Sequence, residues 1–296
     1  MTRGTTGLYQ QVERLERAEA LDDPAAALQE AIAVVVKPGP FKDVLSGTWL
    51  GHPVHPLLVT LPIGSWAGAT VLDLTAGAGG RDAADRLVGL GVLTALPTAL
   101  AGASDWLDTA GGERRVGLVH AVGNYVAVGL MGASWLARKR GRRGTGVLLG
   151  LSANAVVLVT GYLGGHMSYS QGVGVDTTAF DSGPQDWTAV ADEADLPVGE
   201  PVAVVADRTT LLLVRQEDRV AVLAARCTHR GGPLQEGAVA DGCVTCPWHG
   251  SVFRLADGHV VRGPAVQPQP VYESRSRDGR VEVRRAEPKG QRRNAI

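Results

Sequence analysis

Two short segments near the C-terminus of this 296-residue chain carry side chains that bind metals. Cys227–His229 reads Cys-Thr-His, and Cys246–His249 reads Cys-Pro-Trp-His. Together they supply two thiolates and two imidazoles, which suit either a tetrahedral zinc ion or a [2Fe–2S] cluster with two histidines on one iron. Because such pairs do not by themselves fix the metal, the surrounding residues have to distinguish the two.

The surrounding residues resemble the Rieske iron–sulfur family. Cys227–Leu234 reads Cys-Thr-His-Arg-Gly-Gly-Pro-Leu, and Cys246–Ser251 reads Cys-Pro-Trp-His-Gly-Ser. Gly263–Ala265 (Gly-Pro-Ala) is similar to the proline loop that lies over the cluster in that family. The resemblance extends over the whole C-terminal β region and implies a Rieske domain there.

The resemblance implies a role for each ligand. Cys227 and Cys246 hold the inner iron, and His229 and His249 bind the outer iron through Nδ1. Neutral imidazoles in place of thiolates raise the reduction potential into a range of roughly −150 to +300 mV. Their exposed position also lets them couple electron transfer to proton transfer. The residues expected around the cluster are Gly231, Pro233, Ser251, Gly263 and Pro264.

Departures from the family pattern indicate which type of Rieske domain this is. High-potential Rieske proteins join an extra cysteine in each loop as a disulfide, whereas Gly232 and Trp248 stand near those positions here. Phe253 replaces a tyrosine that bonds a cluster thiolate, while Ser251 keeps a hydroxyl for a bridging sulfide. Fewer donors to sulfur lower the potential, so the domain resembles the ferredoxin type. We interpret the third cysteine, Cys243, as a strand residue and not as a ligand.

Two functions are excluded at this point. A Rieske oxygenase needs a further domain with a 2-His-1-carboxylate iron site, and only His259, in an Asp-Gly-His turn, follows His249. We therefore expect an electron-transfer component of an oxidoreductase system and not an oxygenase catalytic subunit. The 29 basic residues are balanced by 30 acidic ones, which excludes a nucleic-acid partner bound through bulk positive charge.

Four long stretches of the chain before this domain lack Asp, Glu, Lys and Arg. Each is long enough for a helix of about 27 Å, close to the thickness of a bilayer core. Buried helices of a large soluble domain would also be apolar, but four such runs in succession favour a membrane bundle. The stretches are Val54–Leu72, Leu87–Ser104, Val116–Ala137 and Gly144–Val175.

The expected fold is therefore multidomain, with an N-terminal all-α four-helix transmembrane bundle followed by a small all-β Rieske domain. Leu8–Glu19 and Pro24–Val36 have helical spacing and precede the bundle. Apolar runs of strand length, separated by turn residues, predict the β domain; they are Val202–Ala206, Leu211–Val214, Val220–Ala224, Val252–Leu255 and Val281–Val283. We expect a partly helical segment over 1–50, the membrane domain over 51–170, a linker over 171–186, the Rieske domain over 187–286 and a basic tail over 287–296.

Four further histidines, His52, His55, His120 and His166, are predicted near one end of the bundle, because the chain crosses four times and returns to the same side. Within a helix, His52 and His55 would share one face, and Asn124 would lie beside His120. Ionisable residues inside a membrane are usually functional. Haem, a metal ion or a quinone is a candidate ligand for these histidines. The alternative is that they cap helix ends at the interface.

A second resemblance concerns the bundle. Gly51–Pro56 (Gly-His-Pro-Val-His-Pro) and Gly161–His166 (Gly-Tyr-Leu-Gly-Gly-His) resemble DUF2231, a family of four-span bacterial membrane domains. The similarity covers Gly51–Met167 and implies no activity. It does imply a bacterial, multi-pass cell-membrane protein in contact with lipid.

Positive charge near the spans predicts the orientation of the bundle. The end away from the four histidines carries Arg81, Arg86, Arg138, Lys139, Arg140, Arg142 and Arg143, and the histidine end carries Lys37, Lys42, Arg114 and Arg115. The positive-inside rule then places the Rieske domain on the extracytoplasmic side. The pair Arg142-Arg143 weakly resembles a twin-arginine export signal, which agrees with this orientation.

These features predict a membrane-anchored Rieske protein. It would carry single electrons between a membrane donor, a quinol or a haem, and a redox partner docking near His229 and His249. The alternative is a redox-sensing or assembly protein whose cluster state regulates a partner without turnover.

Overall fold

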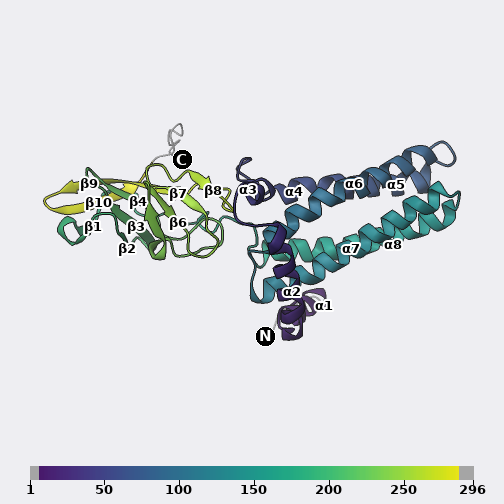
Figure 1. Cartoon of the computed structure of the whole chain (residues 1–296), viewed down its shortest axis with the longest axis horizontal. Coiled ribbons are helices and arrows are strands. Elements are labelled where there is room, and N and C mark those ends of the chain that lie inside the picture. The colour runs from purple at the N-terminus through teal and green to yellow at the C-terminus, as the bar shows by residue number, and fades with distance from the viewer. Residues whose placement is uncertain (1–6, 287–296) are drawn as a thin grey trace. The chain divides into compact units, whose positions relative to one another are not determined.

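The computed structural model describes residues 7–286, so the predicted basic tail over 287–296 lies outside the described residues. The chain divides into two compact units (Figure 1). The helical unit comprises the chain up to Lys37 together with Pro53–Gly174, and the β unit comprises Pro38–His52 together with the chain from Val175 onward. The predicted multidomain architecture, helical first and then β, is confirmed.

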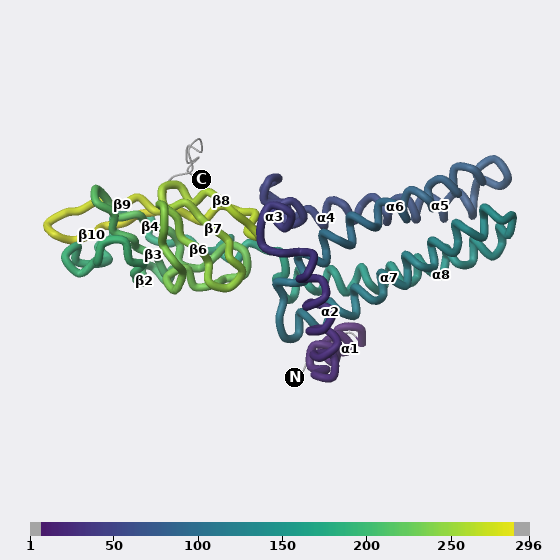
Figure 2. Tube along the Cα trace, in the orientation of Figure 1, coloured from purple at the N-terminus to yellow at the C-terminus, as the bar shows by residue number. Residues whose placement is uncertain are grey.

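Four helical segments of the first unit are long and apolar enough to cross a membrane. They are Val54–Thr75, which consists of α4 (Val54–Leu58) and α5 (Thr60–Thr75), then α6 (Arg81–Trp106), α7 (Gly111–Lys139) and α8 (Arg143–Tyr169). They form two antiparallel hairpins, α5–α6 and α7–α8 (Figure 2).

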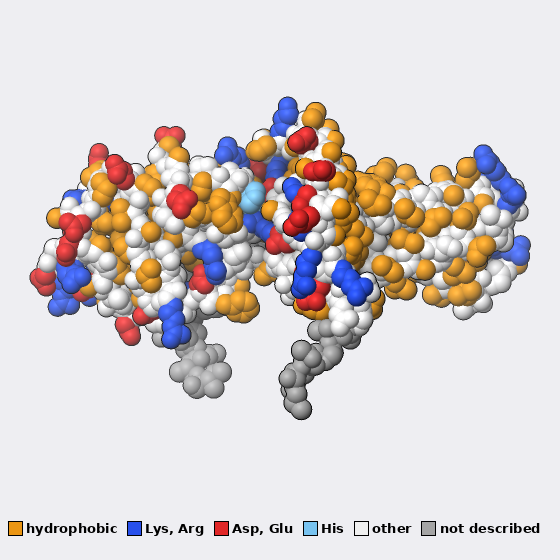
Figure 3. Space-filling view, turned by 90° about the horizontal axis from the view of Figure 1, so that it is seen from below, with side chains coloured by type: hydrophobic (Ala, Val, Ile, Leu, Met, Phe, Trp, Pro, Cys, Tyr) orange, Lys and Arg blue, Asp and Glu red, His pale blue; other side chains and the backbone are white. Residues whose placement is uncertain are grey.

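The surface of these helices suits a lipid environment. Between 22% and 39% of the most apolar stretch of each helix is buried inside the protein, so most of it faces outward. Hydrophobic side chains cover the visible face of the bundle, and Lys and Arg gather at the end with the two hairpin turns (Figure 3). An apolar band with charges at its end is typical of a membrane-spanning bundle.

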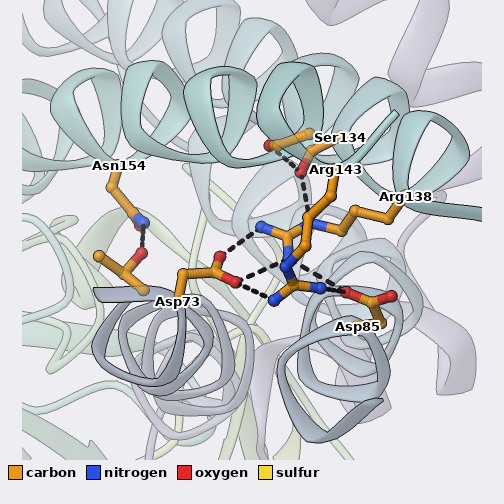
Figure 4. Close-up of polar contacts among 8 residues, drawn as sticks. Asp73, Asp85, Ser134, Arg138, Arg143 and Asn154 are labelled. Atoms are coloured by element: carbon orange, nitrogen blue, oxygen red, sulfur yellow. Dashed lines mark hydrogen bonds and ion pairs between the residues drawn. The ribbon is translucent and has the colours of Figure 1, made fainter. Parts of the chain in front are cut away.

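A cluster of ion pairs joins the helices near the two hairpin turns (Figure 4). Arg138 of α7 and Arg143 of α8 both contact Asp73 of α5 and Asp85 of α6. The Arg138 side chain is 1% exposed and that of Asp73 is 4% exposed. Since buried charges are tolerated only when they are paired, this cluster fixes the four helices relative to one another.

The N-terminal helices pack on the histidine end of the bundle. They are α1 (Gly7–Glu16) and α2 (Asp22–Val35), joined by the short 3₁₀ helix η1 (Glu19–Leu21). Asp22 accepts hydrogen bonds from Arg114 and Arg115 at the start of α7, and the Arg115 guanidinium is the main reason that the pKa of Asp22 falls to about 2. These contacts make α1 and α2 part of the membrane unit.

The β unit contains two antiparallel sheets. Its larger sheet has the order β1-β10-β9-β4-β3-β2, with β1 Thr188–Asp192, β2 Pro201–Ala206, β3 Thr209–Arg215, β4 Val220–Ala224, β9 Val271–Arg277 and β10 Arg280–Arg285. Its smaller sheet has the order β5-β6-β7-β8, with β5 Ala238–Ala240, β6 Cys243–Thr245, β7 Val252–Arg254 and β8 Val260–Arg262. Two short 3₁₀ helices, η2 (Glu193–Asp195) and η3 (Leu234–Glu236), and the helix α3 (Pro40–Ser46) complete the unit.

One hydrophobic core links the smaller sheet to the larger one. Leu212 and Leu223 of the larger sheet pack with Phe253 of the smaller sheet and with Leu234, all fully buried. Cys227 and Cys246 belong to the same core. Apolar packing therefore fixes the two loops that carry the predicted metal ligands, one leaving β4 and the other leaving β6.

Candidate metal centre

The two ligand loops have the same main-chain hydrogen-bond pattern. In the first, the Cys227 N–H donates to the Gly232 carbonyl and the Gly231 N–H donates to the Cys227 carbonyl. In the second, Cys246 makes the equivalent bonds with Ser251 and Gly250. Gly231 and Gly250 both have a φ of +75°, a left-handed conformation that favours glycine. Each loop therefore closes on itself and holds its cysteine and histidine at a set spacing.

The two thiols meet inside the protein. Cys227 is 1% exposed and Cys246 is 2% exposed. Their mutual hydrogen bond lowers the pKa of Cys246 to about 6 and, together with burial, raises the pKa of Cys227. Main-chain N–H groups also point at both sulfurs, those of His229 and Arg230 at Cys227 and those of Trp248 and His249 at Cys246. Such N–H···S bonds stabilise metal-bound thiolates.

The two imidazoles lie together at the outer edge of the same site. The ring centroids of His229 and His249 are 5.2 Å apart, and the ring planes are nearly perpendicular. Both residues are half-buried, in contrast to the buried thiols. The four ligands therefore form an inner pair of sulfurs and an outer pair of nitrogens.

This pairing fits a two-iron cluster better than a single zinc ion. Among residues 7–286, no three His, Cys, Asp or Glu side chains are placed to share one metal ion. A [2Fe–2S] cluster of the Rieske type needs only two protein ligands for each iron. The donor set thus has the chemistry of such a cluster, in which Cys227 and Cys246 would hold one iron and His229 and His249 the other.

A buried glutamine supports the first ligand loop, and the sequence patterns did not single it out. Gln269, 2% exposed, donates to the carbonyls of Ala224 and Arg226 and accepts the Thr228 N–H. The Thr228 hydroxyl in turn donates to the Gln267 carbonyl. Because these contacts cross about forty residues of sequence, only the folded chain reveals them.

The expected second-loop residues also meet the proline loop. Ser251, fully buried, accepts the Ala265 N–H at 3.0 Å. Gly263 and Pro264 precede Ala265 and are joined by a cis peptide bond. Ser251 thus ties the second ligand loop to the segment that the family resemblance places over the cluster.

The proline loop is clamped by the Pro38–His52 segment, which the sequence analysis had divided between the N-terminal segment (1–50) and the membrane domain (from 51). The Gly263 N–H donates to the Asp43 carboxylate at 3.0 Å, and the Thr48 hydroxyl donates to the Ala265 carbonyl at 3.1 Å. A Cβ atom on Gly263 would lie 2.8 Å from that carboxylate oxygen and would also collide with Thr48. Glycine at 263 therefore permits the close approach of this clamp.

Comparison with known proteins agrees with this geometry. The model of the "Rieske [2Fe-2S] domain" matches residues 186–273. The anthranilate 1,2-dioxygenase ferredoxin subunit of Burkholderia cepacia is 33% identical over 98 residues, which are 33% of this chain and 91% of that protein. This chain belongs to the Rieske [2Fe–2S] family. The N-terminal part matches a second model, "Predicted membrane protein (DUF2231)", over residues 51–177.

Other relatives cover the Rieske domain in different contexts. Ferredoxin CarAc of Metapseudomonas resinovorans is 28% identical over 100 residues, 33% of this chain and 94% of that protein. Apoptosis-inducing factor 3 of Homo sapiens is 31% identical over 103 residues, 34% of this chain but only 17% of that protein. The ferredoxin of carbazole 1,9a-dioxygenase from Nocardioides aromaticivorans, a solved structure, has 24% identity and a TM-score of 0.33 over 34% of this chain and 100% of its own.

All three cysteines of the chain are free thiols in the structure, so the Rieske domain has no disulfide between its loops. Cys243 lies in β6, and Phe253 is buried in the core of the domain. Cys243 also lines a shallow groove of about 530 Å³ beside Asp43 and Asp241. Its place in a strand agrees with the interpretation that it is no cluster ligand.

The structure separates the four histidines of the N-terminal part. His55 and His120 are both bonded to main-chain carbonyls inside the bundle, whereas His166 pairs with Glu16 of α1 at 2.7 Å. His52 is exposed and belongs to the β unit. The predicted contact between His120 and Asn124 is confirmed, with Asn124 Nδ2 3.1 Å from His120 Nε2.

One prediction about these histidines is wrong. His52 and His55 do not share a helical face, because α4 begins only at Val54. Pro53 has a ψ of 131°, an extended conformation that directs the preceding residues out of the helix. The proline fixes the start of the first span and excludes His52 from it.

Proposed function

We propose that this protein carries single electrons between a donor in the membrane and a redox partner that docks over His229 and His249. The observation that carries this proposal is the pair of equivalent loops, which hold two thiols and two imidazoles, in a chain with four membrane-length helices. One-electron chemistry follows from the cluster type, since a [2Fe–2S] centre exchanges one electron. When bound, the cluster supplies the redox step, and the residues of the chain hold and shield it.

The proposed docking surface surrounds the imidazole end of the site. Trp248 is 57% exposed, and its ring lies 6.4 Å from that of His249. An exposed tryptophan beside a redox centre is a typical anchor for a protein partner, since aromatic residues are enriched at interface hot spots. The ferredoxin name of the relatives supports another redox protein as the partner.

We also propose that the Rieske domain lies on the extracytoplasmic side of a bacterial cell membrane. Arg138 and Arg143 are engaged by Asp73 and Asp85, but the rule that predicts orientation counts positive residues, not net charge. A reporter enzyme active only outside the cytoplasm, fused after β10, should be active. Activity of a cytoplasmic reporter at the same position would reverse the orientation.

The test of the electron-transfer proposal uses the full chain purified in detergent. Reduction with dithionite should produce the EPR signal of a reduced Rieske cluster, and a soluble one-electron acceptor such as cytochrome c should then reoxidise it. Trp248→Ala should slow this second step several-fold without changing the EPR signal. Zinc in place of iron, or a cluster that no soluble acceptor can oxidise, would contradict the proposal.

A further inference from the structure

The two halves of the membrane bundle hold one histidine each in the same way. In the first half, His55 Nδ1 of α4 lies 3.0 Å from the Thr98 carbonyl of α6. In the second half, His120 Nδ1 of α7 lies 2.8 Å from the Thr160 carbonyl of α8. Both helices that carry a histidine start from the same end of the bundle, so the two halves are related as repeats.

A glycine lies beneath each imidazole ring, one helical turn after the threonine. A Cβ atom on Gly102 would lie 2.8 Å from His55 Cε1, and one on Gly164 would lie 3.1 Å from His120 Cε1. Side chains at these two positions would push the rings out of place. The bundle therefore contains two equivalent imidazole sites, each formed by a threonine carbonyl and a glycine.

The hydrogen bonds determine which nitrogen of each ring can bind a ligand. A carbonyl oxygen only accepts, so Nδ1 of His55 and of His120 must carry the proton, and the lone pair is on Nε2. Metal-binding histidines are commonly oriented by this Nδ1–H···O=C bond, which leaves Nε2 to the metal. The Asn124 amide donates to His120 Nε2, which agrees with the same tautomer.

The two Nε2 atoms differ in their surroundings. His55 Nε2 has no hydrogen-bond partner among the described residues. His120 Nε2 is approached by Asn124, whose amide also donates to the His120 carbonyl at 2.9 Å and whose oxygen accepts the Thr160 hydroxyl. Asn124 keeps these two bonds when it releases Nε2, so His120 is also able to take a ligand.

The two imidazoles lie on helices of one packed bundle. The helix α4 packs against α6, α6 packs against α7, and α7 packs against α8. Within the described part of the chain, no third His, Cys, Asp or Glu joins them as a metal ligand. A bare metal ion would lack protein ligands here, whereas a porphyrin brings four nitrogens of its own and needs only two axial ligands.

We propose that His55 and His120 are the axial ligands of a b-type haem held between the two halves of the bundle. The inference rests on the proposed function and specifies the electron donor in the membrane as a haem. Oxidation of the haem iron from ferrous to ferric releases one electron, and reduction of the [2Fe–2S] cluster takes up one electron, so the exchange balances. His55 is three residues along the chain from His52, the last residue of the β unit before the membrane unit resumes.

The experiment is spectroscopy of the full chain, produced with a haem precursor and purified in detergent, with added hemin where loading is incomplete. The wild type should show a Soret band, one haem b per chain, and the Rieske EPR signal. His55→Ala and His120→Ala should each lose nearly all of the haem and keep the EPR signal. His166→Gln is the matched control, because His166 lies in the same bundle but pairs with Glu16, and it should keep both.

A variant that replaces one axial ligand by another distinguishes loss of a ligand from misfolding. His120→Met should retain the haem with an altered spectrum and a higher haem potential, because methionine is an axial ligand that raises the potential. A wild type that shows the Rieske signal but binds no haem, with or without a bound quinone, overturns this inference and leaves the proposed function standing. Haem retained in both alanine variants overturns the ligand assignment. Haem without any Rieske signal overturns the proposed function instead.

Discussion

The two units of this protein position their histidines over very different distances along the chain. In the Rieske domain, His229 and His249 each follow a predicted ligand cysteine within the same short loop, and the loop closes through its own main-chain hydrogen bonds. In the bundle, His55 and His120 come from separate helices, and their Nδ1 partners lie on two further helices. A loop encodes its site locally, whereas a bundle creates one only when the helices pack.

The two units also stabilise charge differently. Main-chain N–H groups surround the thiols of the Rieske domain. Side chains of all four membrane helices provide the charge balance in the bundle, through Arg138, Arg143, Asp73 and Asp85. Main-chain N–H donors do not depend on side-chain identity, so most substitutions in the loops leave these hydrogen bonds in place. The ion cluster depends on each of its members, which makes the bundle more sensitive to single changes.

The largest expected effect comes from breaking the local site. Cys246→Ser should abolish the Rieske EPR signal of the reduced protein, because the inner iron loses one of its two thiolates. Cys243→Ser is the matched control, since Cys243 lies in β6 and should leave the signal intact. A signal retained in Cys246→Ser, or lost in Cys243→Ser, would contradict the ligand assignment.

The next effect tests the packing of the bundle. Arg138→Met should lower the free energy of unfolding in detergent by up to about 3–5 kcal/mol, because it removes the buried guanidinium and leaves Asp73 and Asp85 only the partly exposed Arg143 as a partner. Arg143→Met removes the same kind of charge from a side chain that is 25% exposed, so its cost should be clearly smaller. Circular dichroism during denaturation measures both, and equal costs would refute the distinction.

A smaller effect is expected where long-range contacts support the local loop. Gln269→Leu leaves the Ala224 and Arg226 carbonyls and the Thr228 N–H without their partner, and a buried polar group left unpaired costs about 1–3 kcal/mol. Cluster loss on heating, followed by visible absorption, should therefore occur at a lower temperature.

Gln267→Leu provides the comparison for this loop. The Gln267 side chain makes one described hydrogen bond, to the Gly51 carbonyl, and does not contact the ligand loop through that side chain. The cluster should therefore be almost as stable as in the wild type. An equal loss of stability in the two variants would show that Gln269 has no special role.

The smallest effect concerns the clamp on the proline loop. Burial raises the pKa of Asp43, against the opposing effect of the Gly263 N–H. Asp43→Asn removes the carboxylate charge and should raise the cluster potential by tens of millivolts at neutral pH, on the scale of about 59 mV for each tenfold change in a one-electron equilibrium. The difference from wild type should shrink as the pH falls, because a protonated Asp43 is also neutral.

Asp241→Asn is the control for this comparison. Asp241 lines the same groove, has a left-handed φ of 49° that asparagine tolerates, and makes no described contact with the proline loop. Protein-film voltammetry of the two variants should show the larger shift for Asp43→Asn. Equal shifts would mean that the clamp does not influence the cluster.

Much of the fold was predictable because its signals are local. The five predicted strands correspond to β2, β3, β4, β7 and β10; the runs of the first three are wholly apolar, and those of β7 and β10 each contain one charged residue. Others gave no such signal: β5, β6 and β8 have three residues each, and β9 is a largely polar strand. Short or polar strands form because their neighbours pair with them, and that pairing is not visible in their own sequence.

The sequence by itself predicted the cluster ligands and determined the four membrane-length helices and their order, because each is specified within one loop or one helix. Tertiary structure decided which distant groups meet. It brought Pro38–His52 onto the proline loop, placed Gln269 beneath the first ligand loop, and joined His55 to Thr98 and His120 to Thr160. Such contacts depend on how apolar faces pack in space, which residue spacing along the chain does not record.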